Sequence, residues 1–254
     1  MTNAGGHYSH AENFNNEARG FSSHAEGIMT ITDGDAAHAE GIDTYSGGTG
    51  THAEGLSANA YGEGTHAEGY GTSADGVGSH SEGYYSSAEG EGAHAEGRLT
   101  NAYGYGAHAE GCGTEANSSG THAEGGNLAE DGLTGLGNVK HSIDNNDRYT
   151  NQTIAEGVQS HAEGTQTLAS GYSAHAEGYR TDANGKASHA EGGNFSGNGE
   201  LVKSLTTFII DDGTDRIEYG VNGPRAEGNG SHAEGNATFA YGFASHSEGY
   251  KTLA

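Results

Sequence analysis

The chain has 254 residues, a formal net charge of −25, 47 glycines and a single proline. Val, Ile, Leu and Phe supply only about a ninth of it, a composition that alone is typical of intrinsic disorder. The negative charge argues against nucleic acid and anionic membranes as partners, because both would repel the chain.

No apolar stretch is long enough to cross a membrane, so we expect no membrane insertion. The N-terminal residues 1–13 lack the basic region and apolar core of a secretory signal. The single cysteine, Cys112, excludes an intramolecular disulfide framework and a thiolate metal cage. We expect it to be an ordinary solvent-facing residue after the Gly111 turn.

Residues 1–125 carry a strict repeat. Fourteen of the 16 histidines lie in a His-(Ala/Ser)-Glu motif that is almost always followed by Gly. Nine consecutive copies are 14 residues apart, from His10 to His122. Such a period indicates a solenoid in which each copy is one turn, and a disordered chain has no reason to keep that register.

Each turn consists of two half-turns. Seven residues before His66 stands Asn59-Ala60-Tyr61-Gly62, a degenerate x-Ala-x-Gly copy, and similar copies precede other repeat histidines. A coiled coil is rejected, because a Gly in nearly every heptad costs roughly 1 kcal/mol each in a helix. Short strands that end at glycine turns fit instead and predict a flattened solenoid with two parallel sheets.

Strand alternation assigns the two sides of each strand. In residues 65–69, Thr65 and Ala67 point one way while His66 and Glu68 point the other. The first set is small in every copy, which predicts a very narrow interior with His and Glu outside. The repeated His and Glu residues, here called the His/Glu face, are the same in every turn, whereas the opposite outer face varies. We expect the His/Glu face to meet something that repeats identically, most simply the same face in a homotrimer.

Two roles are open for this face. Each imidazole could donate a hydrogen bond to a neighbouring carboxylate, or the His-x-Glu columns could ligate a divalent metal. Fourteen sites are too many for a catalytic or sensory metal, so we expect paired side chains, no metal and no cofactor. The columns considered for metal are His52, Glu54, His66, Glu68, His80, Glu82, His94 and Glu96. The other residues expected at the trimer interface are His10, Glu12, His24, Glu26, His38, Glu40, His108, Glu110, His122, Glu124, His161, Glu163, His175, Glu177, His189, Glu191, His232, Glu234, His246 and Glu248.

Pairing across a trimer axis has a consequence for pH. Neutral imidazoles would leave three carboxylates uncompensated in each turn, which favours protonated histidines. We therefore expect imidazole pKa values above the free value near 6.5, and trimer stability that declines on the alkaline side.

Two insertions interrupt the repeat. Residues 126–153 are polar and irregular, and the repeat returns over 154–192. Residues 193–223 contain two β-rich runs around an Asp/Gly turn, which predict a β-hairpin, and the repeat closes over 224–254. The insertions could brace the trimer or contact a target.

The repeat resembles a known family. The segments Ser79-His80-Ser81-Glu82-Gly83 and Thr121-His122-Ala123-Glu124-Gly125 are similar to YadA-like head repeats of trimeric autotransporter adhesins (Hep/Hag type). The His-Ala-Glu-Gly variant more closely resembles repeats of bacteriophage tail-fibre and appendage proteins. The resemblance covers about four-fifths of the chain and implies a left-handed parallel β-roll assembled as a homotrimer. The signal, coiled-coil stalk and membrane anchor of an autotransporter are not seen in this sequence, nor is a phage-fibre chaperone or receptor-binding tip.

We expect an all-β structural protein without enzymatic activity, in a virion or an extracellular fibre. The first candidate is a phage tail-fibre shaft or head that aids attachment to a host-surface glycan or protein. The second is an adhesin or filament subunit that stacks end to end, and the third is a polysaccharide-degrading fibre. For the third, no carboxylate stands out from its repeat, and Trp, a common sugar-stacking residue, is absent. Sugars could stack instead on tyrosines that we interpret as ordinary surface residues: Tyr61, Tyr70, Tyr84, Tyr103, Tyr105, Tyr179 and Tyr250.

Overall fold

A computed structural model describes residues 2–126, 152–193, 205–209, 215–219 and 223–254. The chain forms two compact units, Met1–Ala123 and Glu124–Ala254. The described residues are all-β and make about 14 turns of a parallel β-solenoid, as the repeat predicts. They contain no helix, and hence no helix that is long and apolar enough to cross a membrane.

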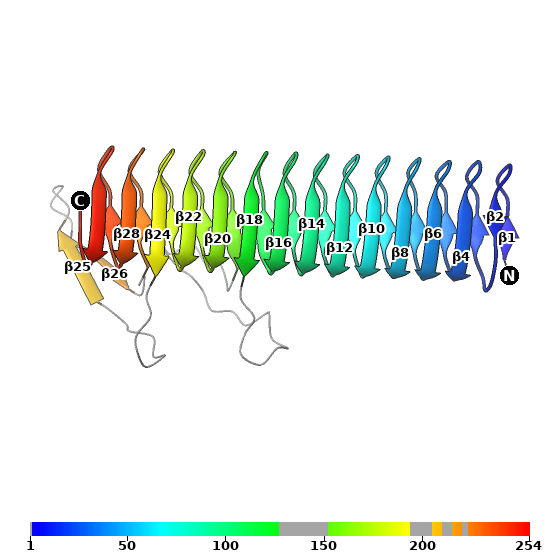
Figure 1. Ribbon diagram of the computed structural model, residues 1–254, viewed down its shortest axis with the longest axis horizontal. Coiled ribbons are helices and arrows are strands. Elements are labelled where there is room, and N and C mark those ends of the chain that lie inside the picture. The colour runs from blue at the N-terminus through cyan, green and yellow to red at the C-terminus, as the bar shows by residue number, and fades with distance from the viewer. Residues whose placement is uncertain (1, 127–151, 194–204, 210–214, 220–222) are drawn as a thin grey trace. The chain divides into compact units, whose positions relative to one another are not determined.

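Every turn of the first unit contributes one strand to each of two parallel sheets, and the strands follow one another turn by turn (Figure 1). The short strands are β1 (Asn3–Ala4), β3 (Glu17–Ala18), β5 (Ile31–Thr32), β7 (Tyr45–Ser46), β9 (Asn59–Ala60), β11 (Ser73–Ala74), β13 (Ser87–Ala88), β15 (Asn101–Ala102) and β17 (Thr114–Ala116). The His-bearing strands are β2 (His10–Ala11), β4 (His24–Ile28), β6 (His38–Ile42), β8 (His52–Leu56), β10 (His66–Tyr70), β12 (His80–Tyr84), β14 (His94–Arg98) and β16 (His108–Cys112). The next one, β18 (His122–Gly126), contains the boundary between the units.

The second unit repeats this plan. Its short strands are β19 (Thr153–Ala155), β21 (Leu168–Ala169), β23 (Asp182–Ala183), β27 (Arg225–Ala226) and β29 (Phe239–Ala240). Its His-bearing strands are β20 (His161–Thr165), β22 (His175–Tyr179), β24 (His189–Gly193), β28 (His232–Asn236) and β30 (His246–Tyr250).

The predicted hairpin segment forms an antiparallel pair. Strand β25 (Leu205–Ile209) pairs with β26 (Asp215–Tyr219), in a register that runs from Leu205↔Tyr219 to Ile209↔Asp215. The expected first insertion lies almost entirely outside the described residues, since β18 ends at Gly126 and β19 begins at Thr153.

The register between turns matches the 14-residue period. His66 on β10 pairs with His52 on β8 and with His80 on β12, so each His stands beside the His of the next turn. Between turns, the backbone N–H of a residue donates to the carbonyl 13 residues later, as from His52 to Thr65 at 2.9 Å. These ladders satisfy the backbone polar groups that a chain with so few apolar residues must pair.

The interior is as narrow as predicted. Thr65 and Ala67 of one half-turn and Thr72 and Ala74 of the other are all at most 2% exposed. Where such a Ser or Thr precedes the His, its hydroxyl often donates to a turn carbonyl, as from Thr65 Oγ1 to Gly62 O at 2.9 Å. Small side chains on both sheets let the two sheets approach closely, so the order of the fold comes from backbone ladders and methyl-sized contacts.

The glycine after each His-x-Glu is required by the backbone. At Gly69 the φ angle is +114°, and a Cβ would lie 2.2 Å from the carbonyl oxygen of Gly83 in the next turn. Only glycine fits a position that combines this φ with so close an approach of a neighbouring chain.

Positive φ angles also mark the two half-turns. They occur at seven-residue intervals, as at Ser57, Gly64, Gly71 and Gly78. A residue of this conformation turns the chain after each strand, which gives two bends in each 14-residue turn. The x-Ala-x-Gly echo in the sequence therefore corresponds to a real second half-turn.

Candidate functional site

The His/Glu face lies on the outer side of the His-bearing strands, as predicted. Burial alternates along each strand, so that in β10 the side chain of Ala67 is fully buried while His66 and Glu68 remain 35% and 38% exposed. His66 and Glu68 point to the same side of the strand because they are two residues apart. Each turn therefore offers one imidazole and one carboxylate on this face.

The imidazoles form continuous stacks. In the first unit nine rings, from His10 to His122, stack with centroids 4.7–4.9 Å apart and planes within 6° of parallel. In the second unit five rings, from His161 to His246, stack at 4.8 Å. The spacing follows from the distance between neighbouring strands, since identical residues occupy identical positions in successive turns.

In nine turns a carboxylate lies close to the imidazole of the same strand. The Nε2–Oε2 distance in the same-strand pairs is 3.3–3.8 Å, with His66 and Glu68 at 3.5 Å. A good hydrogen bond between these atoms would be 2.7–3.2 Å long. Within the described chain the expected imidazole-to-carboxylate hydrogen bond is therefore not formed, as in the pair His52–Glu54.

The Nε2 atoms are shielded from solvent although the side chains are half-exposed. The Nε2 atoms of His38, His52, His66 and His80 are covered and have no hydrogen-bond partner among the described residues. Leaving such an atom unsatisfied is costly, which makes it a candidate position for a further ligand or partner.

Four imidazoles of the stacks have a lowered pKa in the single chain. Burial lowers the pKa of the His66 imidazole, and the neighbouring imidazoles of His52 and His80 lower it further. The carboxylates of Glu68 and Glu54 act in the opposite direction but more weakly. The pKa values of His38, His94 and His232 are lowered for the same reasons. In the single chain the pKa values of these four imidazoles are thus lowered, mainly by burial and then by neighbouring imidazoles. The rise expected for imidazoles paired with carboxylates across a trimer axis stays a prediction.

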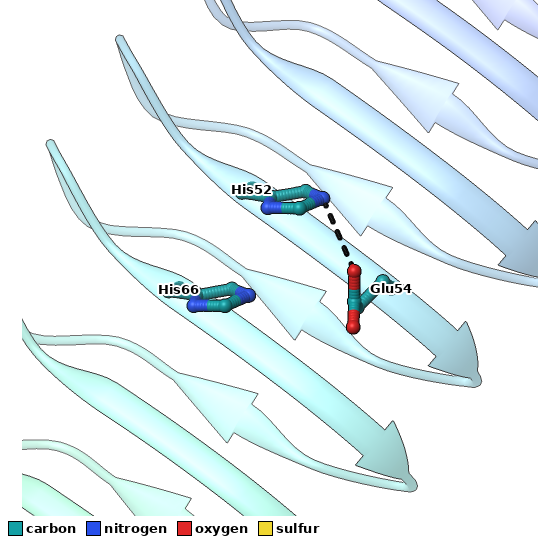
Figure 2. A group of neighbouring side chains, drawn as sticks. All are labelled: His52, Glu54 and His66. Carbon is teal, nitrogen blue, oxygen red and sulfur yellow. Dashed lines mark ion pairs between the residues drawn. The ribbon is translucent and has the colours of Figure 1, made fainter.

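Three side chains from two successive turns converge at several points on this face. Figure 2 shows His52 and His66 one above the other, with the carboxylate of Glu54 beside their Nε2 edges. Their ligating atoms all lie within 4.8 Å of one another. Equivalent groups are His66, Glu68 and His80; His94, Glu96 and His108; and His108, Glu110 and His122.

A line of apolar residues borders the Glu column, and our sequence analysis missed it. The residue after each glycine is Ile28, Ile42, Leu56, Tyr70 or Tyr84 in successive turns, and each is 37–44% exposed. The signal was present in the sequence as an apolar residue four positions after each of these histidines. Contiguous exposed apolar residues often mark a contact surface.

The candidate tyrosines are spread over several places on the turn. Tyr70 and Tyr84 stack with ring centroids 5.1 Å apart on the His-bearing strands. Tyr61 follows a short strand, and Tyr105 lies in a turn. Cys112 is a free, half-buried cysteine at the end of β16.

Neither the family models nor the curated proteins contain a match to this chain. The resemblance to trimeric head repeats and to phage fibre repeats therefore rests on the repeat residues alone, and what the structure adds to it is a parallel β-solenoid with turns of about 14 residues.

Proposed function

We propose that this chain is a structural, non-enzymatic fibre protein that assembles as a homotrimer of left-handed β-rolls with the His/Glu face on the trimer axis. In this proposal it forms a shaft or head segment of a bacteriophage tail fibre or appendage and contributes to attachment at a host surface. It acts outside the host cell, in a virion, by presenting a surface and not by turning over a substrate.

The observation that carries this proposal is the contrast between two outer faces. The His/Glu face has the same two residues in every turn, in register from strand to strand. The outer face of the short strands changes from Asn59 and Tyr61 to Ser73 and Asp75 in the next turn. Water does not require uniformity, so a face that repeats identically fits a partner with the same repeat, such as another copy of the chain.

The polar character of the face also supports self-assembly. Shielded Nε2 atoms without a hydrogen-bond partner lie beside carboxylates that are only partly buried. The same groups on a second copy could supply hydrogen bonds that the single chain does not make. The apolar line from Ile28 to Tyr84 borders the face and would add apolar area to such an interface.

Light scattering on the purified chain tests the assembly. We expect a trimer at micromolar concentration. His52→Ala, His66→Ala and His80→Ala combined should weaken the trimer at least tenfold. Asn59→Ala, Ser73→Ala and Ser87→Ala, which remove three side chains from the opposite face of similar turns, should leave it intact. A monomeric wild-type chain, or equal behaviour of the two triple variants, would contradict the proposal.

Electron microscopy of the same sample tests the fibre role. Discrete particles of uniform length agree with a segment of a fibre. Long filaments would indicate a subunit that polymerises end to end, which is the alternative extracellular function.

A further inference from the structure

We propose that the His/Glu face binds divalent transition-metal ions such as Zn²⁺, each held by the His and Glu of one turn and the His of the next. The site is clearest at His52, Glu54 and His66 (Figure 2). This inference goes beyond the proposed function, because it rests on the geometry of the single chain.

The first argument is the separation of the paired atoms. Zn²⁺ binds imidazole nitrogen and carboxylate oxygen with bonds of about 2.0–2.2 Å, so two such ligands in a tetrahedral site lie roughly 3.3–3.5 Å apart. The same-strand Nε2–Oε2 distances of 3.3–3.8 Å are near this value and too long for a hydrogen bond. The His-x-Glu pairs are thus spaced as two ligands of one ion.

The second argument is the third ligand. The Nε2 of His66 lies within 4.8 Å of both the His52 and the Glu54 ligand atoms. The imidazole must tilt out of its stack to complete the bond, and a side chain that is about a third exposed has room for that rotation. Two imidazoles and one carboxylate are a donor set that zinc uses in proteins, with the fourth position left for water.

The third argument is charge. The chain has a net charge of −25, and the Glu residues of the face lie in a column with one carboxylate in each turn. A divalent ion bound between two turns would compensate part of this negative charge.

The repeat limits how many ions can bind. Neighbouring groups share a histidine, as the groups of Glu54 and Glu68 share His66. An ion therefore uses two turns, and the nine stacked imidazoles of the first unit make at most four separate pairs. The five stacked imidazoles of the second unit make at most two.

Equilibrium dialysis against ZnCl₂, followed by metal analysis, tests the proposal. The test variant carries Glu54→Gln, Glu68→Gln, Glu96→Gln and Glu110→Gln. The control variant carries four other changes in the same part of the chain: Glu63→Gln, Asp75→Asn, Glu89→Gln and Glu91→Gln. Both variants lose four negative charges, but the control positions are exposed and lie away from the His/Glu face.

We expect several zinc ions per wild-type chain, an equal number in the control variant and about one fewer in the test variant, whose remaining carboxylates still allow three separate pairs in the first unit. Equal stoichiometry in the two variants would overturn the proposal, because binding would then depend only on net charge or on other groups.

Co²⁺ loading of the wild-type chain keeps the proposal testable if the test variant does not fold. The d–d absorption bands of protein-bound Co²⁺ should appear and be abolished by excess Zn²⁺, and their absence would overturn the proposal.

Light scattering with and without a chelator separates the metal site from the proposed trimer. A trimer that persists in chelator while zinc fails to bind would leave the proposed function standing and end this inference.

Discussion

The two outer faces of the roll are built on the same turns but follow different rules. In each turn both half-turns contain a short parallel strand with a buried Ala, as at Ala67 and Ala74. The outward residues are uniform on one face and varied on the other. The uniformity of the His/Glu face is the observation on which the proposed self-assembly rests.

The short-strand face carries side chains that vary from turn to turn and pair irregularly. Arg19 forms ion pairs with Glu17 and, at 3.0 Å, with Asp33, which also accepts a hydrogen bond from the Tyr45 hydroxyl. This group spans three successive turns and is not repeated in the next. Exposed pairs of this kind contribute little to stability, typically 0–1 kcal/mol. The contrast teaches that irregular pairing suffices for a solvated face.

The largest expected effect comes from replacing glycines that lie against the backbone of the next turn, one glycine in each half-turn. A Cβ at Gly69 would lie 2.2 Å from Gly83 O, and a Cβ at Gly62 would lie 2.6 Å from Asp75 O. We expect Gly69→Ala and Gly62→Ala each to cost about 3 kcal/mol or more, since backbone must move and overpacking alone costs ~1–3 kcal/mol. Gly64 is the control, because its φ is +66° but no atom lies within 4 Å. Gly64→Ala should cost only about 1–2 kcal/mol.

Urea unfolding followed by circular dichroism measures all three glycine variants. A tolerated Gly62→Ala beside a destabilised Gly69→Ala would show that the two half-turns differ in backbone as well as in side chains. That outcome would contradict the expectation that both half-turns require glycine where they approach the next turn.

A smaller effect is the pH dependence of stability, which we expect to come from the His/Glu face. The described short strands contain no histidine, whereas the pKa values of His38, His66, His94 and His232 on the other face are lowered by burial and by stacking. A lowered folded-state pKa means that the unfolded chain binds more protons. Stability is therefore complete above the unfolded value near 6.5 and falls as the pH drops from there through the folded values.

Melting temperatures between pH 5.5 and 8.5, measured with a chelator present, test this sign. We expect a flat profile above pH 7 and a decline below pH 6.5 that flattens when the four histidines are replaced by Asn. A decline on the alkaline side would instead mean that the imidazoles are protonated, as our interpretation of the sequence assumed for a trimer.

The smallest effect concerns the two kinds of turn. The turn after a short strand has glycine at its positive-φ position in several turns, as at Gly64, whereas the turn after a long strand holds Leu99 at φ +57°. Leu99→Gly should relieve about 1–2 kcal/mol of strain. Greater freedom of the unfolded chain offsets about 0.4–1 kcal/mol of that, so the net gain is between about 0 and 1.6 kcal/mol. Leu99→Ala, which keeps the strain, should not stabilise. Equal stability of the two variants would show that this turn is unstrained.

Most of the fold could be predicted from the sequence because a strict period leaves few alternatives. The 14-residue spacing fixes the turn, the small residues around Ala67 identify the interior, and strand alternation places His66 and Glu68 outside. The antiparallel pair over 205–219 follows from two β-rich runs around a turn signal. Positive φ at Leu99 and Tyr85 could not be predicted, since neither residue favours it and the ladder of neighbouring turns imposes it.

The site could be located but its chemistry could not be deduced. Strand alternation fixes the direction of the Cα–Cβ bonds and therefore the face. It does not fix the side-chain torsions that set the 3.5 Å separation of His66 Nε2 and Glu68 Oε2. A sequence pattern also does not show that the Nε2 atoms are shielded from solvent. That shielding depends on how successive imidazoles pack at 4.8 Å.

The identity of successive turns has a cost for recognition between chains. A second copy that slides along the His/Glu face by one whole turn meets the same imidazoles and the same carboxylates, so this face alone cannot tell one alignment from the next. The line beside it can, because it changes from Ile28 and Ile42 to Leu56 and then to Tyr70 and Tyr84. A shift of one turn would place a tyrosine ring where an aliphatic side chain belongs. In an assembly of this kind the uniform His and Glu columns would hold the chains together. The residues after the glycines, which differ from turn to turn, would select a single alignment.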